Sequence, residues 1–121
     1  MANIKESLNE VNELDGFVGA CIVDSDSGMM MGAIGGGGVI NLELAAAGNT
    51  EVVRAKRKTM KALSISDSIQ DILITLNTQY HIIRPLPQND AIFVYVVIDK
   101  NRGNLALARH KLTSIATELK V

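Results

Sequence analysis

The 121-residue sequence is poor in the residue types that build disulfides and metal sites. It contains one cysteine, two histidines and no tryptophan, so neither an intramolecular disulfide nor a cysteine-based zinc site can form. Charges of opposite sign nearly cancel, and the formal net charge is -1 at pH 7. That balance gives no general attraction to nucleic acid or to an anionic membrane.

A long apolar run and a signal peptide are also missing. The N-terminal segment MANIKESLNEVNEL is polar and amphipathic, whereas a secretion signal requires a basic start followed by an apolar run. No later stretch approaches the ~18 apolar residues of a membrane span. We therefore expect a cytoplasmic protein without a membrane span, in which residues 1–121 form a single domain.

The aliphatic residues that make up much of the chain predict eight elements. Apolar spacing indicates an N-terminal helix over Ile4–Leu14, with Asn3 and Glu6 as a capping box, and a C-terminal helix after Gly103. Between them we expect strands at residues 17–24, 29–34, 71–77, 80–86 and 91–99, and a central helix at residues 41–63.

The connections between these elements decide the fold class. Short turns join neighbouring strands, and Pro85, Pro87 and Asn89-Asp90 are expected to break the chain between the last two strands. The last strand, AIFVYVVID, is apolar throughout, which predicts a central position with both faces covered. The fold is therefore expected to be α+β, with a five-stranded antiparallel sheet, helices on both faces and the order αββαβββα.

The stretch DSDSGMMMGAIGGGG, from Asp24 to Gly38, could be taken for a calcium or phosphate loop. An EF-hand loop requires a glycine at its sixth position and a bidentate glutamate at its twelfth, but Met29 and Gly35 stand there. A phosphate loop requires a lysine after its last glycine, and Val39 follows Gly38. We therefore expect a hairpin turn followed by a flexible connection, with no metal and no cofactor.

The central helix has an unusually wide apolar surface. Its apolar side chains spread over roughly 200° of the helical projection, whereas a helix on a protein surface usually shows a stripe of ~100°. The apolar side chains beyond the usual stripe are small ones from Ala45 to Gly48, so another backbone could approach the helix closely. A second copy of the helix across a two-fold axis is the economical partner. The alternative is that the alanine run packs beneath a loop of the same chain.

The run RAKRKTMK, residues 54–61, places five cations near the end of the same helix. Cations there complement the negative end of the helix dipole, and no aromatic residue stands among them to stack on a base. We expect a solvated helix face, with a partner-facing patch as the alternative, and no nucleic-acid binding.

No group of residues specifies a reaction. His81 and His110 lie on different elements and have no cysteine or close acidic pair at the spacing of metal ligands. Cys21 falls inside an apolar strand, where an inert core thiol is expected, and no serine occupies a G-x-S-x-G elbow. We therefore expect no catalytic residues and a protein that is not an enzyme.

Several segments of the sequence resemble a prokaryotic member of the Roadblock family of dynein light-chain-related proteins. The most specific are DGFVGACIVDSDSG, which leads into the second strand, and DKNRGNLALAR, which opens the last helix. The Ala-rich helix ending in VVRAKRKTMKAL and the strands in DILITLNTQYHIIRPL complete the pattern. The resemblance covers nearly the whole chain and implies a Roadblock/profilin-like form of the expected fold.

The resemblance implies a homodimer in which the central helices pack together. The strand from Ile69 to Leu76 would join its dyad mate in one continuous sheet. This agrees with the wide apolar surface of the helix and with a strand too apolar to be left as a naked edge. The residues expected at the dimer interface are Leu44, Ala45, Gly48, Val52, Ile69, Ile72 and Ile74.

Members of the family act without a cofactor, as regulators or scaffolds for Ras-like small GTPases and as subunits of motor complexes. The resemblance therefore implies a homodimeric regulator or scaffold, with a GTPase-activating or adaptor role and a Ras-like small GTPase as partner. The alternative is a small-ligand sensor or structural adaptor on a profilin-like fold with no GTPase partner. A third hypothesis, nucleic-acid binding through the basic end of the central helix, predicts steeply salt-dependent retention on DNA or RNA.

Overall fold

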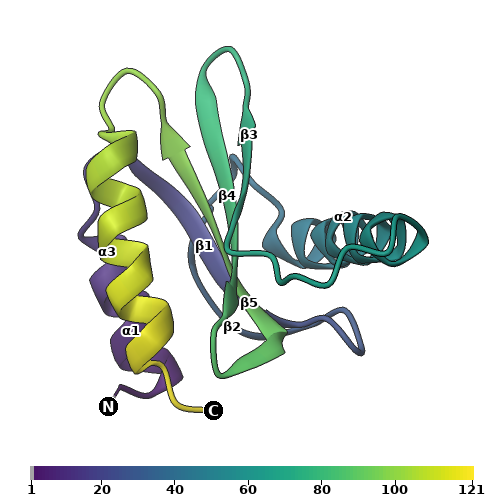
Figure 1. The fold of residues 1–121 in the computed structure, drawn as a ribbon. Helices are drawn as coiled ribbons and strands as arrows, with labels where there is room; N and C mark the ends of the chain where they lie inside the picture. The colour runs from purple at the N-terminus through teal and green to yellow at the C-terminus, as the bar shows by residue number, and fades with distance from the viewer. Residues whose placement is uncertain (1) are drawn as a thin grey trace.

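The computed structural model describes residues 2–121, which form one antiparallel sheet with helices on both faces (Figure 1). The elements, in chain order, are α1 (Ile4–Asn12), β1 (Phe17–Asp24), β2 (Met29–Gly35), α2 (Leu42–Ala62), β3 (Ile72–Thr75), β4 (Gln79–Leu86), β5 (Asn89–Asp99) and α3 (Leu105–Glu118). The strands lie side by side in the order β2-β1-β5-β4-β3. The predicted α+β class and αββαβββα order are confirmed.

The central strand β5 is buried on both faces. Its residues Ile92–Ile98 are all buried, because α1 and α3 cover one side of the sheet and α2 lies on the other (Figure 1). Alternate side chains therefore belong to two cores. Val94 and Val96 lie in the core beneath α1 and α3, whereas Phe93 and Tyr95 lie in the core beneath α2. The central position predicted for this strand is confirmed.

Asparagine side chains cap the three helices. Asn3 and Glu6 form the expected capping box of α1, in which each side chain accepts a hydrogen bond from the backbone N–H of the other residue. The side chains of Asn41 and Asn104 accept hydrogen bonds from the first turns of α2 and α3. None of the helices in residues 2–121 is long and apolar enough to cross a membrane.

The hairpin between β4 and β5 differs from the expectation. Pro87 lies in the turn between the two strands, as predicted. Pro85 lies within β4, and Asn89-Asp90 begin β5, so the prediction is wrong for those residues. The turn is tighter than expected because Leu86 pairs with Asn89. Beyond Ile83 the outer side of β4 has no partner strand in the described chain, and such an unpaired edge is where a sheet tolerates a residue without an N–H.

A polar network lies among the apolar side chains beneath α2. The Tyr95 hydroxyl lies 2.9 Å from Nδ1 of His81, and Nε2 of the same ring lies 2.9 Å from Oε1 of Gln79. Both ring nitrogens are therefore occupied in the folded chain. Burial lowers the pKa of His81 from its ordinary value of 6.5, because the charged imidazolium loses hydration on burial.

Acidification is expected to destabilise the fold through His81. Since burial lowers its pKa in the folded chain, the unfolded chain binds the proton more readily, and the free energy of unfolding decreases as the pH falls below about 6.5. Urea unfolding at about pH 7.5 and about pH 5.5 measures this loss, which should be smaller in His81→Gln than in the native chain. His110→Gln, at an exposed histidine, is the matched control. Equal losses in the two variants would contradict the assignment.

Candidate functional site

One flank of α2 carries only small or apolar side chains. At 100° per residue, seven residues fall within an arc of about 100°, and none of them is charged. We call this surface the α2 flank; it consists of Leu44, Ala45, Gly48, Val52, Ala55, Thr59 and Ala62. The residues that α2 buries against the sheet, Leu42, Ala46 and Val53, lie on a different side of the helix.

No part of the described chain covers the middle of the α2 flank. A Cβ atom built on Gly48 would meet no atom within 4 Å, and Leu44 is 71% exposed. No loop of the described chain therefore covers Gly48 or Leu44. Within the alanine run itself, Ala46 is buried in the core beneath α2 and Ala47 is exposed. Because Gly48 has no side chain, another backbone could approach α2 closely at this point.

The outer edge of β3 is the second candidate feature. This strand lies at the end of the sheet, and Ile72–Thr75 pair with β4 on one side only. Within residues 2–121, the backbone groups on its other side face no strand. Such an edge is a template for pairing with another chain, and Ile74 leaves apolar surface exposed beside it.

The strand is shorter than the predicted span from Ile69 to Leu76. Pairing ends where Ile72 meets Ile83. If the same register continued for two more residues toward the end of β4, Pro85 would have to pair with the segment before Ile72, and proline has no N–H to donate. Ile69 therefore precedes β3 in an irregular segment, and its assignment to the strand is wrong.

The seven residues predicted at a dimer interface lie in three environments. Those half-buried at the margin of the core beneath α2 are Ala45, Val52 and Ile72. Those left exposed are Leu44, Gly48 and Ile74. The seventh, Ile69, is half-buried in the segment before β3. Because side chains alternate along a strand, Ile74 faces the same side of the sheet as Ile72, so the flank and the edge present apolar groups on one side of the molecule.

Two arginines of the basic run bind turns of the sheet. Nη2 of Arg54 donates to the carbonyl oxygens of Ser25 at 2.7 Å and Asp26 at 2.9 Å, in the turn between β1 and β2. Nη2 of Arg57 donates to the carbonyl oxygen of Asp90 at 2.6 Å, near the start of β5. These two side chains are held by the turns, although the Arg54 side chain is still 48% exposed, so the expectation of a solvated face holds for Arg54 and only in part for Arg57. It also holds for the lysines of the run, which are exposed.

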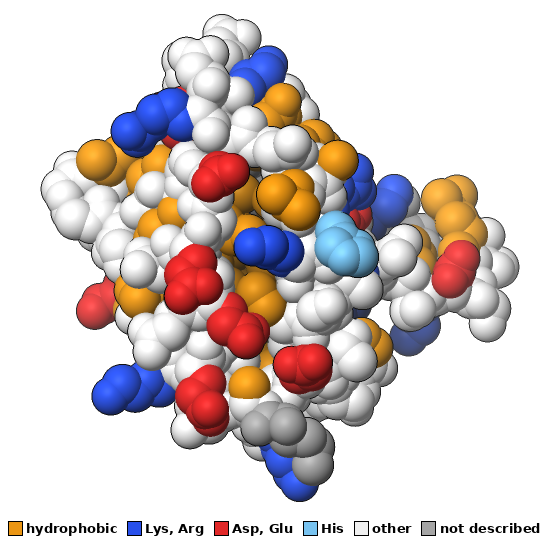
Figure 2. Space-filling model, turned by 90° about the vertical axis from the view of Figure 1, so that its left-hand side faces the viewer, with side chains coloured by type: hydrophobic (Ala, Val, Ile, Leu, Met, Phe, Trp, Pro, Cys, Tyr) orange, Lys and Arg blue, Asp and Glu red, His pale blue; other side chains and the backbone are white. Residues whose placement is uncertain are grey.

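The face over α1 and α3 has a different character. Figure 2 shows charged side chains spread over it, many of them acidic, with apolar side chains scattered among them. The exposed glutamates of α1 are Glu6 and Glu10, and Glu13 follows them. Because the cores of protein interfaces are depleted in charged residues, the uncharged α2 flank is the better candidate for a buried contact.

The acidic and glycine-rich stretch forms the expected turn. Oδ1 of Asp24 accepts a hydrogen bond from the N–H of Asp26 at 2.9 Å, which is the local bond of an Asx turn. Gly28, at the end of the turn, has a φ of 78°, which favours glycine. Residues 2–121 contain no group of three or more histidine, cysteine or acidic side chains that could hold a metal ion.

The residues considered for catalysis do not form a reactive group. Cys21 is fully buried, and burial raises the pKa of its thiol to about 12, which leaves almost no thiolate at neutral pH. His81 is bound to Tyr95, and His110 is exposed on α3. The prediction that Cys21 is a core thiol is confirmed.

A partly buried charge cluster is the main feature that sequence reasoning missed. Asp71, just before β3, accepts two hydrogen bonds from Arg109 of α3, at 2.9 and 2.7 Å. It also accepts one from Arg84 of β4, at 3.4 Å. The available signal was Arg84 itself, a charged residue inside the apolar strand HIIRPL. Its partners could not be inferred because they lie on elements distant in sequence.

No protein-family model matches the sequence, and no curated protein sequence matches it. Solved structures match the fold. The Roadblock/LC7 domain from Streptomyces avermitilis has a TM-score of 0.78 at 9% identity, over 95% of this chain and 92% of that chain. MglB from Myxococcus xanthus has a TM-score of 0.73 at 14% identity, over 91% of this chain and 82% of its own.

A third solved structure agrees with these two. The gliding protein mglB from Thermus thermophilus has a TM-score of 0.71 at 17% identity, over 95% of this chain and 89% of that chain. In all three, the likeness extends over most of both chains, so it concerns the whole arrangement of sheet and helices. The resemblance seen in the sequence is thereby confirmed at the level of the fold: the chain has the fold of the Roadblock/LC7 domain.

Proposed function

We propose that the chain is a homodimeric, non-enzymatic regulator or scaffold for a Ras-like small GTPase in the cytoplasm. Residues 1–121 would act as one Roadblock-like domain. The observation that carries the proposal is the uncharged α2 flank on the same side of the sheet as the open edge of β3. The partner class comes from the family resemblance of the sequence, and the fold shared with MglB supports it.

A second copy related by a two-fold axis would cover the flank and the edge together. Two α2 flanks can approach closely at Gly48, where no side chain intervenes. Two β3 edges can pair as antiparallel strands, because a two-fold axis between them reverses the strand direction. Each copy would then bury the same exposed apolar side chains, among them Leu44 and Ile74.

The nucleotide chemistry is assigned to the partner. The glycines from Gly35 to Gly38 are followed by Val39 and Ile40, and this connection has no lysine to hold a phosphate. The chain would therefore act by binding one nucleotide state of the GTPase more tightly than the other, which shifts the nucleotide cycle by the difference in binding free energy.

A glutamine at position 48 is expected to dissociate the dimer without unfolding the chain. A Cβ atom at position 48 has open space around it outside the backbone of the helix, and glutamine is a better helix former than glycine, but the new side chain would lie between two α2 flanks. We expect the dissociation constant of the dimer to rise by about tenfold or more, a cost above about 1.4 kcal/mol. Sedimentation equilibrium measures it, and circular dichroism reports the fold.

Ala47→Gln is the matched control for this experiment. Ala47 is also exposed on α2, but it lies 100° round the helix from Gly48, outside the α2 flank. The control should dimerise as the native chain does. A native chain that is monomeric at high concentration, or a Gly48→Gln variant with unchanged mass, would show that the α2 flank does not form a dimer interface.

The GTPase role is tested by capture followed by kinetics. The immobilised chain is exposed to soluble extract of the source cell, once with GDP and once with a non-hydrolysable GTP analogue. We expect a small P-loop GTPase to be retained in one nucleotide state, and the purified GTPase to hydrolyse GTP at a changed rate when the chain is added. The chain alone should not bind a fluorescent GTP analogue.

Three outcomes separate the competing functions. Nucleotide-dependent retention with a changed rate supports a regulator. Retention with an unchanged rate supports a scaffold. The absence of a GTPase in both samples, while the chain is a dimer, would favour the sensor or structural adaptor and refute the GTPase role.

A further inference from the structure

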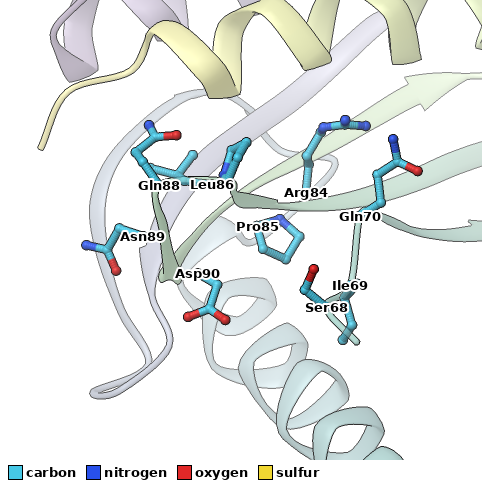
Figure 3. A pocket seen from close by; sticks show the side chains of 10 residues that line it. Ser68, Ile69, Gln70, Arg84, Pro85, Leu86, Gln88, Asn89 and Asp90 are labelled. Carbon is cyan, nitrogen blue, oxygen red and sulfur yellow. The ribbon is translucent and has the colours of Figure 1, made fainter. Parts of the chain in front are cut away.

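A cavity of about 580 Å³ opens at the end of β4 that β3 does not cover. Its walls are the segment before β3 and the residues from the end of β4 to the start of β5 (Figure 3). The lining residues are Ser68, Ile69, Gln70, Arg84, Pro85, Leu86, Pro87, Gln88, Asn89 and Asp90. The volume lies within the range of about 300–1,000 Å³ that is usual for small-molecule sites.

Arg84 is the cationic residue of this lining, and its charge is not fully compensated. Its side chain is only 7% exposed, and its single hydrogen bond to a carboxylate is a long one, 3.4 Å from Nη1 to Oδ2 of Asp71. Arg109 already binds both oxygens of Asp71, at 2.9 and 2.7 Å. One carboxylate thus faces two guanidinium groups, of which Arg109 is 43% exposed and Arg84 only 7%, so the weaker pairing with Asp71 falls to the more buried of the two.

The remaining nitrogens of Arg84 are accessible to solvent. Neither Nε nor Nη2 takes part in a side-chain hydrogen bond or salt bridge among residues 2–121. Of the described residues, only Ser7 has a fully buried side-chain polar atom without a partner, so the unpaired nitrogens of Arg84 are not completely buried. Arg84 is among the residues that line the cavity, and its side chain projects beside Gln70 (Figure 3), so its unpaired nitrogens are the candidate donors for an occupant. An uncompensated buried charge is costly and is relieved by a counter-ion.

The other polar groups of the lining are compatible with an anion at this end. In Figure 3, Gln70 projects beside Arg84 on the side of the cavity nearer α3, and Asp90 lies at the opposite end. Asp90 is the acidic member of the lining, and its carbonyl oxygen and carboxylate face Arg57, at 2.6 and 4.0 Å. The N–H donors of Arg84 and Gln70 can therefore bind a negative group that stays away from the carboxylate of Asp90.

We propose that this cavity binds a small organic anion, a carboxylate or a phosphate ester, with its charged group on the Arg84 guanidinium. A planar guanidinium binds both of these groups through two parallel N–H···O bonds. The apolar lining from Pro85 and Leu86 would contact the uncharged part of the ligand. This inference does not depend on the proposed GTPase partner, because the site is complete within one chain.

The direct test follows the Nε–Hε signal of Arg84 in ¹H–¹⁵N spectra of the full chain. Inorganic phosphate and acetate are titrated separately, against sodium chloride at equal ionic strength. We expect a saturable shift of the Arg84 signal and of the Gln70 side-chain amide with at least one of the two anions. The Nε–Hε signal of Arg102, an exposed arginine that does not line the cavity, is the internal control and should not saturate.

Two variants test the charge argument. Arg84→Met should abolish the saturable shift at Gln70, and it should still fold, since Arg109 continues to pair with Asp71. Arg109→Met removes a residue outside the lining but gives Arg84 sole use of Asp71, so it should weaken anion binding. Arg102→Met is the matched control and should bind as the native chain does.

Either of two results would overturn the proposal. One is an Arg84 signal that moves no more with phosphate or acetate than with chloride. The other is a Gln70 shift that persists unchanged in Arg84→Met. If Arg84→Met does not fold, the titration of the native chain decides, because its readout is the arginine itself.

Discussion

The two faces of β5 must both be shielded from water, and most of the architecture follows from this requirement. Seven consecutive residues, Ile92–Ile98, are buried, so an apolar layer is needed on each side of the sheet. Two helices, α1 and α3, form one layer, and α2 alone forms the other. A single helix cannot cover a five-stranded sheet. Because α2 packs against β1 and β2, the far edge at β3 is left with less cover.

This asymmetry explains where the molecule exposes apolar surface. The helix on the thinner side is fixed by Leu42 and Val53 in the core and by Arg54 and Arg57 on two turns. These contacts define which side of α2 faces outward. The outward flank is small and uncharged, and the neighbouring β3 edge is unpaired in one chain. A single chain with this fold therefore presents the two features that an association with another chain would bury.

The charge cluster around Asp71 shows a different consequence of the same topology. It joins the segment before β3 to β4 and α3, and so it fixes an edge strand that only β4 pairs with. Arg84 stands in an apolar strand, which is costly unless its charge is shared. The unequal sharing between Arg84 and Arg109 leaves charge at the rim of a cavity. A structural ion pair and the proposed anion site are thus parts of one cluster.

The sequence by itself determined the elements, their order and the central place of β5. These depend on local spacing of apolar residues, on capping residues such as Asn3, and on turn residues, and all of these signals lie within a few positions of one another. The apolar surface on the outward side of α2 could also be predicted from the helical periodicity, since residues 100° apart face different sides of the helix.

Only the tertiary structure decided what those surfaces contact. The end of β3 at Ile72 depends on which residue of β4 lies opposite. Arg54 and Arg57 meet turns some thirty residues away in the sequence, and Asp71 meets Arg109 across a separation of 38 residues. Such contacts are set by how the chain closes its loops around the sheet, and a charged residue does not specify its partner by local pattern. The sequence therefore specified which residues form helices and strands, whereas the packing of those elements assigned roles to their polar side chains.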